Sequence, residues 1–311
     1  MESDRIYESV HKRYGSVVRS STGEYENAVA KAFGYTEDEL VGIPEGANLG
    51  LSCGNPHVLA KLREGETVID LGSGAGFDVF SAAKRVGLAG KAIGVDMNRN
   101  MIDKAMANAE RAGCENVKFV ESQITSIPLP DEVADCVISN CVINLVPTAE
   151  KSSVFHEIYR LLKPGGRVAI SDILARKEFT QKIKRNAALY VGCVAGASQV
   201  AEYDAFLRDA GFNNVIILDS KSDLNVYYTA LGDETSCCGT KDYSKSKGEE
   251  SCVLKEKVLS CGASSSICAQ QEDDHLTPSE AKEQATSLGV TDLNEWAGSF
   301  KIYAMKPKVG E

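Results

Sequence analysis

The sequence predicts an α/β fold built around a mostly parallel sheet. From residue 67 onward, short apolar runs alternate with segments of helical spacing. The first run leads into a Gly-rich turn, Gly72–Gly76, and a later helical segment stops at Gly113. Strands that alternate with helices in this way form βαβ units, which close as a parallel sheet with right-handed crossovers.

Each element follows from the hydrophobic pattern and from its Gly or Pro boundaries. Strands are predicted at residues 67–71, 91–96, 117–121, 134–139 and 167–172. The helices between them are predicted at residues 77–85, 100–111 and 149–162, the last closed by Lys163-Pro-Gly-Gly166. The Met and Leu stripes of these helices are interpreted as core.

The two ends of the chain have weaker patterns. Helices at residues 4–14 and 24–33 precede a break at Pro44, Gly46 and Gly50. Beyond the fifth strand we expect helices at 180–191, 199–210 and 279–288, a strand at 215–218, and a strand at 300–305 with the alternation of a sheet edge. Residues 233–276 are rich in Ser, Lys, Glu, Gly and Cys, which predicts a flexible segment.

Composition and charge exclude several classes of partner. The chain has 311 residues and a net charge of −10, from 34 basic and 44 acidic side chains, which argues against nucleic acid. The first residues lack the apolar core of a signal peptide, and no apolar run is long enough for a membrane span. The expected location is the cytoplasm, where ten cysteines indicate reactive or ligand-binding thiols rather than a disulfide framework.

The Gly-rich turn and two acidic residues predict a nucleotide-type cofactor site. Asp70 precedes Gly72 by two residues, and Asp96 follows Gly76 by twenty residues at the end of the second predicted strand. An acid at the position of Asp96 is suited to ribose hydroxyls, whereas Asp70 repels phosphate and suits a cationic ligand. S-adenosylmethionine has both a ribose and positive charge. Alternatively, Asp70 caps a turn and Asp96 caps the following helix.

Three segments resemble class I S-adenosylmethionine-dependent methyltransferases: residues 68–76, 94–96 and 162–166. The resemblance implies a Rossmann-like fold with a mostly parallel seven-stranded sheet, helices on both faces and a smaller C-terminal region. In that family the adenine lies near the end of the third strand, where this chain has Gln123 or Thr125 instead of the frequent acid. The implied cofactor-binding residues are Asp70, Gly72, Ser73, Gly74, Gly76, Asp96, Met97, Gln123, Ile124, Thr125 and Asn140.

Three cysteines predict a soft substrate beside the cofactor. Cys53 precedes the first strand, Cys141 follows the fourth, and Cys193 lies between two helices, so three thiolates on three loops could converge. His57 is the histidine nearest to them in sequence, and no general base is evident. A trigonal thiolate cup suits trivalent arsenic, whose lone pair can attack a sulfonium methyl without a base.

The segments around these cysteines resemble the signature blocks of arsenite S-adenosylmethionine methyltransferases. The blocks are residues 43–56, 138–145 and 189–196, and the resemblance covers residues 5–220. It implies that Cys53, Cys141 and Cys193 bind arsenic. It also suggests a division into an N-terminal segment closing over the site, a methyltransferase core with an insertion, and a C-terminal region: residues 1–66, 67–220 (insertion 176–198) and 221–311.

The chain departs from that family at its N-terminal end. Residues 1–52 contain no cysteine, so a disulfide relay through an N-terminal thiol is not available. Other protein thiols, glutathione or a thioredoxin-type reductase are then expected to reduce the arsenic after each transfer. The adjacent Cys237 and Cys238 resemble family cysteine pairs that suggest arsenite capture, or else are solvated thiols. Cys136 is expected in the core, and Cys114 to be incidental.

The predicted function is methylation of As(III), supplied as a thiol or glutathione adduct, in arsenic detoxification. One alternative is a methyltransferase for a lipid, quinone or sterol, which predicts a large apolar pocket and a base. Another is a metalloid-binding or sensing protein without turnover, against which Asp70, Asp96 and the glycines argue.

Overall fold

The computed structural model describes residues 3–17, 23–184, 186, 193–229 and 278–310. The predicted flexible segment 233–276 lies outside the described residues, as does most of the second half of the predicted helix 180–191. Among the described residues, no helix combines the length and the apolar character that a bilayer span requires.

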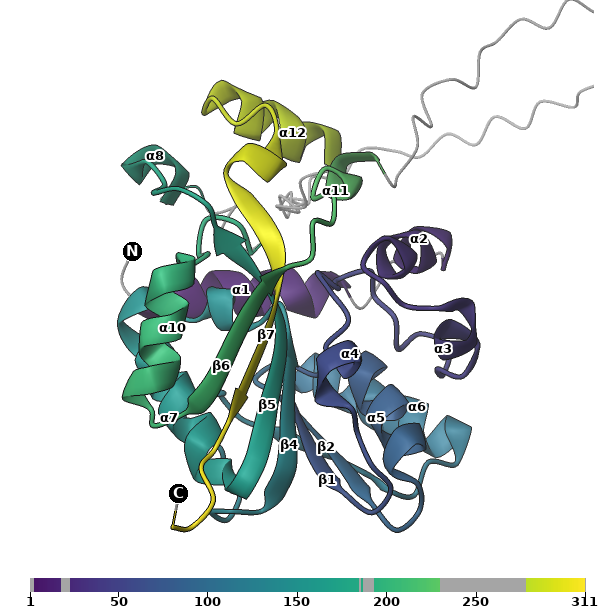
Figure 1. Ribbon diagram of the computed structural model, residues 1–311. Helices are drawn as coiled ribbons and strands as arrows, with labels where there is room; N and C mark the ends of the chain where they lie inside the picture. Colours follow the sequence, from purple (N-terminus) through teal and green to yellow (C-terminus); the bar gives the residue numbers. More distant parts are fainter. Residues whose placement is uncertain (1–2, 18–22, 185, 187–192, 230–277, 311) are drawn as a thin grey trace, which may run out of the picture.

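A seven-stranded, mostly parallel sheet forms the centre of the fold, which confirms the predicted fold class (Figure 1). The strand order is β3-β2-β1-β4-β5-β7-β6, and β7 is antiparallel to both of its neighbours. The strands are β1 (Thr67–Leu71), β2 (Lys91–Asp96), β3 (Val117–Glu121), β4 (Ala134–Asn140), β5 (Leu162–Ala175), β6 (Asn213–Asp219) and β7 (Ala297–Met305).

Helices cover both faces of the sheet (Figure 1). On one face lie α5 (Phe77–Val86) and α6 (Arg99–Ala112), which contact β1, β2 and β3. On the other face, α7 (Lys151–Leu161) contacts β5 and α10 (Val200–Asp209) contacts β6. The apolar stripes of α5, α7 and α10 are buried in clusters with residues of the strands, as the sequence predicts. In α6, Met101 is buried in a small cluster with Leu49 and Ala75 instead, and Met106 is half exposed, so the prediction that its Met stripe is core is only partly right.

Most of the remaining helices lie near the end of the sheet where the parallel strands finish (Figure 1). The longer ones are α1 (Ser3–Val17), α2 (Glu24–Ala32) and α12 (Pro278–Ser287), and the short ones are α3 (Glu37–Val41), α4 (His57–Ala60), α8 (Gln181–Lys184) and α11 (Val226–Thr229). Within the described ranges there are also the 3₁₀ turns η1 (Ile143–Leu145), η2 (Thr148–Glu150) and η3 (Leu293–Glu295). Residues from several of these elements form a separate apolar cluster that includes Cys53, Cys141 and Cys193.

The prediction that residues 300–305 form an edge strand is wrong. They belong to β7, which lies between β5 and β6 and pairs with both. The alternation of Lys301 and Tyr303 with buried residues reflects the two faces of the sheet rather than an open edge. The edge strand at this side is β6, where Ile216 and Leu218 are about half exposed.

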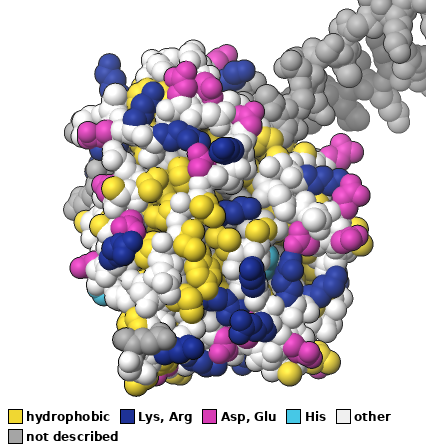
Figure 2. Space-filling view, in the orientation of Figure 1, with side chains coloured by type: hydrophobic (Ala, Val, Ile, Leu, Met, Phe, Trp, Pro, Cys, Tyr) yellow, Lys and Arg dark blue, Asp and Glu magenta, His cyan; other side chains and the backbone are white. Residues whose placement is uncertain are grey.

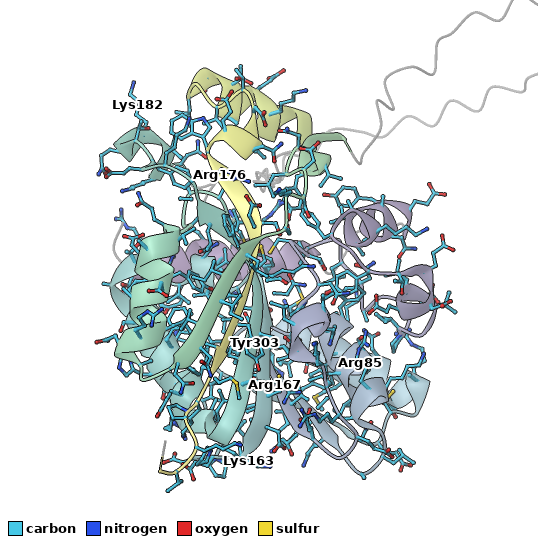
Figure 3. The ribbon with its side chains drawn as sticks, viewed as in Figure 1. Arg85, Lys163, Arg167, Arg176, Lys182 and Tyr303 are labelled. Carbon is cyan, nitrogen blue, oxygen red and sulfur yellow. The ribbon has the colours of Figure 1, made fainter. Side chains whose placement is uncertain are left out.

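The exposed face of β6 is visible as a band of hydrophobic side chains with Lys and Arg beside it (Figure 2). On the same face, Arg167 of β5 and Tyr303 of β7 project from neighbouring strands (Figure 3). Val215 and Ile217, which alternate with the exposed residues of β6, pack instead into the core under α7 and α10. Among the described residues, the helices that pack on β6 therefore lie on one face of this strand.

The fifth strand begins earlier than expected. Residues 163–166, predicted to close the preceding helix, already belong to β5. The pairing of β4 and β5 shifts register between Ala134 and Cys136, which accommodates these added residues. Gly165 has a φ of 80°, and its N–H donates to the carbonyl oxygen of Lys306 at 3.0 Å.

Candidate functional site

The Gly-rich turn joins β1 to α5 in a conformation that needs its glycines. Gly72, Gly74 and Gly76 have φ values of 71°, 50° and 97°, in the region that side chains disfavour. A Cβ atom on Gly72 would lie 2.5 Å from Val142, whereas one on Gly74 would meet nothing within 4 Å. The turn therefore packs tightly against the β4 loop at Gly72 and leaves open space at Gly74.

Asp96 fixes this turn from the end of β2. One oxygen of its carboxylate accepts the N–H of Gly74 at 2.9 Å, and the other accepts the N–H of Asn98 at 2.8 Å. Burial raises the pKa of Asp96, while the N–H groups of Asn98 and Gly74 oppose that rise. The structure thus gives Asp96 a structural partner in addition to the ribose contact that its position predicts.

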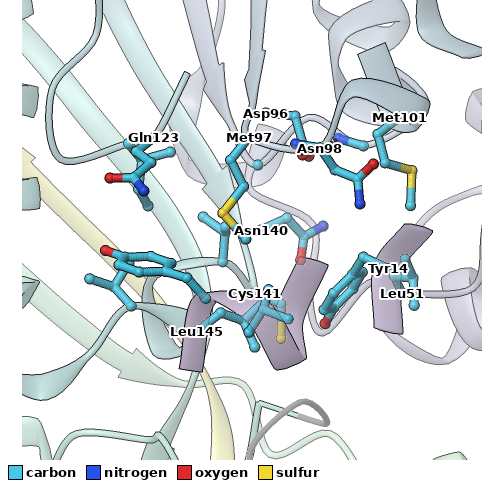
Figure 4. A pocket seen from close by; sticks show the side chains of 17 residues that line it. Tyr14, Leu51, Asp96, Met97, Asn98, Met101, Gln123, Asn140, Cys141 and Leu145 are labelled. Atoms are coloured by element: carbon cyan, nitrogen blue, oxygen red, sulfur yellow. Dashed lines mark hydrogen bonds between the residues drawn. The ribbon is translucent and has the colours of Figure 1, made fainter. Parts of the chain in front are cut away.

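A pocket opens beside the turn at the carboxyl ends of the parallel strands, where α/β proteins bind ligands (Figure 4). Eight residues singled out from the sequence line it: Gly72, Gly74, Asp96, Met97, Gln123, Ile124, Asn140 and Cys141. Helix α1 contributes Tyr7, Val10 and Tyr14, which the sequence did not identify. The N-terminal helix thereby forms part of the pocket wall.

Four other predicted cofactor residues are not among the lining residues. Asp70 is buried at the end of β1, and burial followed by the charges of Asp78 and Asp96 raises its pKa well above the usual value. Ser73 is buried and its hydroxyl has no hydrogen-bond partner within the described protein. Gly76 directly precedes α5. Thr125, the residue after Ile124, is half-buried.

The three predicted thiols lie together next to this pocket. The sulfur atoms of Cys53 and Cys141 and a carboxylate oxygen of Asp172 are all within 4.8 Å of one another. The thiol of Cys193 donates to the carbonyl oxygen of Cys141 at 3.0 Å, and the Cys141 thiol interacts with both other thiols. All three cysteines are buried. Three loops distant in sequence therefore supply one compact group of sulfur atoms.

An unusual backbone conformation occurs at two of these cysteines. Cys141 and Cys193 have φ values of 62° and 64°, which non-glycine residues rarely adopt. The N–H of Cys141 donates to the carbonyl oxygen of Ser171 at 2.9 Å, which ties the loop after β4 to β5. The hydroxyl of Tyr14 on α1 lies 3.8 Å from the Cys193 sulfur.

A polar network around Asn140 positions Cys53. The side-chain oxygen of Asn140 accepts the N–H of Cys53 at 3.2 Å, and its amide group donates to Asp78 and to the carbonyl oxygen of Gly54. Asp78 also accepts the hydroxyl of Tyr35 at 2.7 Å and lies 3.0 Å from His57 Nε2. His57 is thus buried in this network and does not line the pocket.

A second buried network lies behind the thiols. Asp172 accepts hydrogen bonds from Asn144 at 2.8 Å and from the hydroxyl of Tyr203 at 3.0 Å. Lys151 donates to Asn144, to Ser198 and to the carbonyl oxygen of Gly196. Burial raises the pKa of Asp172 to about 7 and lowers that of Lys151 to about 8.

The surroundings of the three thiols favour their neutral form. Burial raises the pKa of Cys53 to about 12, and it also raises that of Cys141 well above the usual value. The hydrogen bond with Cys141 and burial raise the pKa of Cys193. Buried neutral thiols next to one another are a donor set for a soft ion that can displace the protons on binding.

The other cysteines lie apart from this group. Cys136 of β4 is buried in the core, in a cluster that includes residues of α5, as expected. Cys114, which follows α6, is half-buried. Cys237 and Cys238 lie outside the described residues, so the capture role remains an expectation.

Comparisons with known proteins show that the chain is similar to methyltransferases. Residues 62–211 match a family model described as a methyltransferase domain. The chain is 48% identical over 194 residues to an arsenite methyltransferase of Halobacterium salinarum, covering 62% of this chain and 49% of that protein. It is 34% identical over 227 residues to an arsenite methyltransferase of Aquipseudomonas alcaligenes, covering 70% of this chain and 64% of that protein.

The fold also matches solved structures. An arsenic(III) S-adenosylmethionine methyltransferase from Chlamydomonas reinhardtii superposes with a TM-score of 0.51 at 24% identity, covering 91% of this chain and 74% of that chain. The present chain spans about half to two thirds of the length of the two curated relatives. With its strand order, Gly-rich turn and Asp96, the chain has the fold of class I S-adenosylmethionine-dependent methyltransferases, and it is similar in sequence to arsenite methyltransferases.

Proposed function

We propose that this protein methylates trivalent arsenic with S-adenosylmethionine as the methyl donor. The observation that carries the proposal is the convergence of Cys53, Cys141 and Cys193 beside a pocket lined by Asp96 and Asn140. The similarity to curated relatives that are named arsenite methyltransferases supports it.

The residues of the pocket fit the proposed methyl donor. The open space at Gly74 and the Asp96 carboxylate suit a ribose, and the buried Asp70 and Asp78 favour a positively charged ligand nearby. S-adenosylmethionine supplies, when bound, a methyl group on a cationic sulfur. Met97, Gln123 and Ile124 form the wall on the side of β2 and β3, where the resemblance places the adenine.

The thiols would hold the substrate. As(III) arriving as a thiol or glutathione adduct exchanges its ligands for Cys53, Cys141 and Cys193, and each protein proton passes to the departing thiol. Arsenic then presents its lone pair toward the pocket through Cys141, the one of the three cysteines that lines it. Burial excludes water from the reacting atoms, and positioning accounts for most of the rate.

Methyl transfer formally oxidises arsenic, so a reductant must act before another cycle. We infer that glutathione or a thioredoxin-type protein supplies the electrons, because the sequence before Cys53 holds no cysteine. A reducing compartment such as the cytoplasm would keep the thiols available. Arsenic detoxification is the corresponding physiological role.

The main alternative, methylation of a lipid, quinone or sterol hydroxyl or carbon acid, requires a base. No histidine is among the residues that line the pocket, and the carboxylate of Asp96 already accepts two backbone N–H groups. This arrangement favours a substrate whose nucleophile carries no proton.

The deciding experiment incubates the purified protein with arsenite, methyl-labelled cofactor and glutathione, and separates the arsenicals by chromatography. Labelled methylarsenicals are expected. Binding of three-coordinate arsenic without labelled product would instead indicate a metalloid-binding or sensing protein, and absence of both would refute the proposal.

A further inference from the structure

We propose that Asp172 is a catalytic residue whose carboxylate stabilises the positive charge that arsenic acquires during methyl transfer. The inference rests on the proposed function, because it assigns a role to a side chain beside the thiols that would hold arsenic. Neither the sequence motifs nor the pocket point to Asp172, which is revealed by the packing of β5 behind the thiols.

Asp172 is placed to act on an atom held by the thiols. Its side chain is fully buried, and one of its oxygens lies within 4.8 Å of the sulfur atoms of Cys53 and Cys141. Cys141 lines the pocket, whereas Asp172 does not. Arsenic bound to these sulfurs therefore has the pocket on one side and the carboxylate on the side of the protein interior.

The carboxylate is held rigidly by its hydrogen bonds. Asn144 and the N–H of Ile173 donate to one oxygen at 2.8 and 2.9 Å, and the hydroxyl of Tyr203 donates to the other at 3.0 Å. Each carboxylate oxygen can accept a further interaction. These donors therefore fix the orientation of the carboxylate and leave it able to interact with arsenic. A fixed charge in a buried site needs no reorganisation during the reaction.

Lys151 makes this buried charge tolerable. Its ammonium group lies 3.5 Å from the side-chain oxygen of Asn144, whose amide nitrogen in turn donates to Asp172. A buried carboxylate without a cation nearby is strongly disfavoured. Because Lys151 reaches Asp172 through Asn144, the pair remains close while the carboxylate faces the thiols.

The charge balance of the reaction gives the carboxylate its role. The arsenic lone pair forms the bond to the methyl carbon, the carbon–sulfur bond breaks, and its electron pair stays on the sulfur of the donor. Arsenic held by three thiolates is neutral before this step and carries one positive charge after it. A carboxylate next to arsenic therefore interacts more strongly with the transition state than with the bound substrate, which is the condition for catalysis.

The test compares Asp172→Asn, which keeps the size of the side chain but removes the charge, with Tyr203→Phe, which removes one donor and keeps the carboxylate; both are assayed at about pH 8.5, above the pKa of about 7 of Asp172. Single-turnover methyl transfer at saturating arsenite and cofactor should fall roughly 10- to 100-fold in D172N and at most about threefold in Y203F. Arsenite affinity, measured by arsenic–thiolate absorbance, should stay within about threefold of the unsubstituted protein in both variants.

A second measurement detects the charge without turnover. In the absence of arsenic, alkylation of Cys53 at fixed pH should be several-fold faster in D172N than in the unsubstituted protein or Y203F, since the carboxylate disfavours the thiolate. An unchanged alkylation rate would show that Asp172 exerts no field at the thiols and would overturn the assignment.

Each of the other possible outcomes also tests the role of Asp172. A D172N single-turnover rate within about twofold of the unsubstituted protein refutes the assignment, and so does a loss of arsenite binding, which would make Asp172 a ligand. If D172N does not fold, the Lys151→Gln/Asp172→Asn double variant removes both charges, and the same loss of rate is expected there. An unsubstituted protein that forms no methylarsenical refutes the proposed function itself and this assignment with it, so the two failures are distinguishable.

Discussion

The side-chain oxygen of Asn140 accepts the backbone N–H of Cys53 at 3.2 Å, while Asn140 itself lines the pocket at the end of β4. One amide therefore contacts both the space proposed for the cofactor and a loop that carries a thiol. Its two donor hydrogens are held by Asp78, Tyr35 and the carbonyl oxygen of Gly54, so its orientation is fixed. This contact links the two proposed ligands through one side chain.

Asn140→Ala should weaken both ligands. The change leaves the Cys53 N–H without its partner and removes one of the donors to the Asp78 carboxylate, which costs about 2 kcal/mol of stability. Affinities for S-adenosylmethionine and for arsenite, measured by calorimetry, should each fall roughly tenfold. Asn116→Ala is the matched control, because Asn116 bonds two carbonyl oxygens near α5, away from the pocket. Loss of only one affinity in N140A would contradict the proposed link.

Serine at any of the three clustered cysteines should abolish arsenic methylation and leave cofactor binding unchanged. A hydroxyl has a similar size but a poor affinity for soft ions. Turnover of C53S, C141S and C193S should fall at least roughly 100-fold, with calorimetry reporting an unaltered cofactor affinity. Cys114→Ser, at a half-buried position after α6, serves as the control and should keep full activity. Full activity in C141S would contradict the thiol site.

The high pKa of Cys53 predicts how its alkylation depends on pH. Because burial raises this pKa to about 12, the reactive thiolate fraction keeps increasing through the accessible range. Between about pH 7 and pH 9 the alkylation rate, followed by peptide mass spectrometry, should rise about tenfold per pH unit without a plateau. A plateau near the ordinary thiol pKa would show that Cys53 is more exposed than the structure has it.

The ion pair between Arg167 and Glu66 should contribute to stability. Arg167 of β5 donates to both oxygens of Glu66 at 2.9 and 2.8 Å and to the carbonyl oxygens of Ala60 and Lys61, so it joins α4 to the sheet. Arg167→Met should therefore lower the free energy of unfolding by roughly 2 kcal/mol, measured with urea. An unchanged midpoint would show that the contacts are not maintained in solution.

The same pair gives a pH dependence. Partial burial tends to raise the pKa of Glu66, but hydrogen bonds from Arg167 and the Arg63 N–H outweigh it and lower the pKa. A lowered folded-state pKa stabilises the fold above the unfolded pKa and loses that effect as the pH falls through the folded value. The stability difference between the unsubstituted protein and Glu66→Gln should therefore be largest near neutral pH and shrink below about pH 4. A pH-independent difference would contradict this.

The strands of the parallel core were predictable because their signals are local. β1, β2 and β3 have the bounds that their apolar runs predict, since each run is bounded by Gly or polar residues. The position of β7 was not predictable in this way. Its pairing with β5 and β6 depends on contacts between residues more than 80 positions apart, and period-2 alternation does not distinguish an edge from an inner strand.

The proposed site was only partly accessible to sequence reasoning. Asp96 and the Gly-rich turn stand out through their spacing, and the cysteines through their soft chemistry. Asp172, Lys151 and Tyr14 come from three elements whose proximity is created by packing, so no spacing along the chain marks them. Asp172 did offer one signal, since it is an acid inside the apolar second half of a buried strand.

The left-handed backbone at Cys141 and Cys193 bears on how this chain tolerates mutation. Glycine adopts such a conformation at less cost than any side chain, by roughly 1 kcal/mol per position. Selection for a sturdy fold alone would therefore exchange both residues for glycine, and each exchange would discard a thiol. The chain nevertheless has cysteine at both positions, which indicates that the thiols matter more for function than the lost stability. Mutations to glycine selected there for higher stability would therefore abolish the proposed activity.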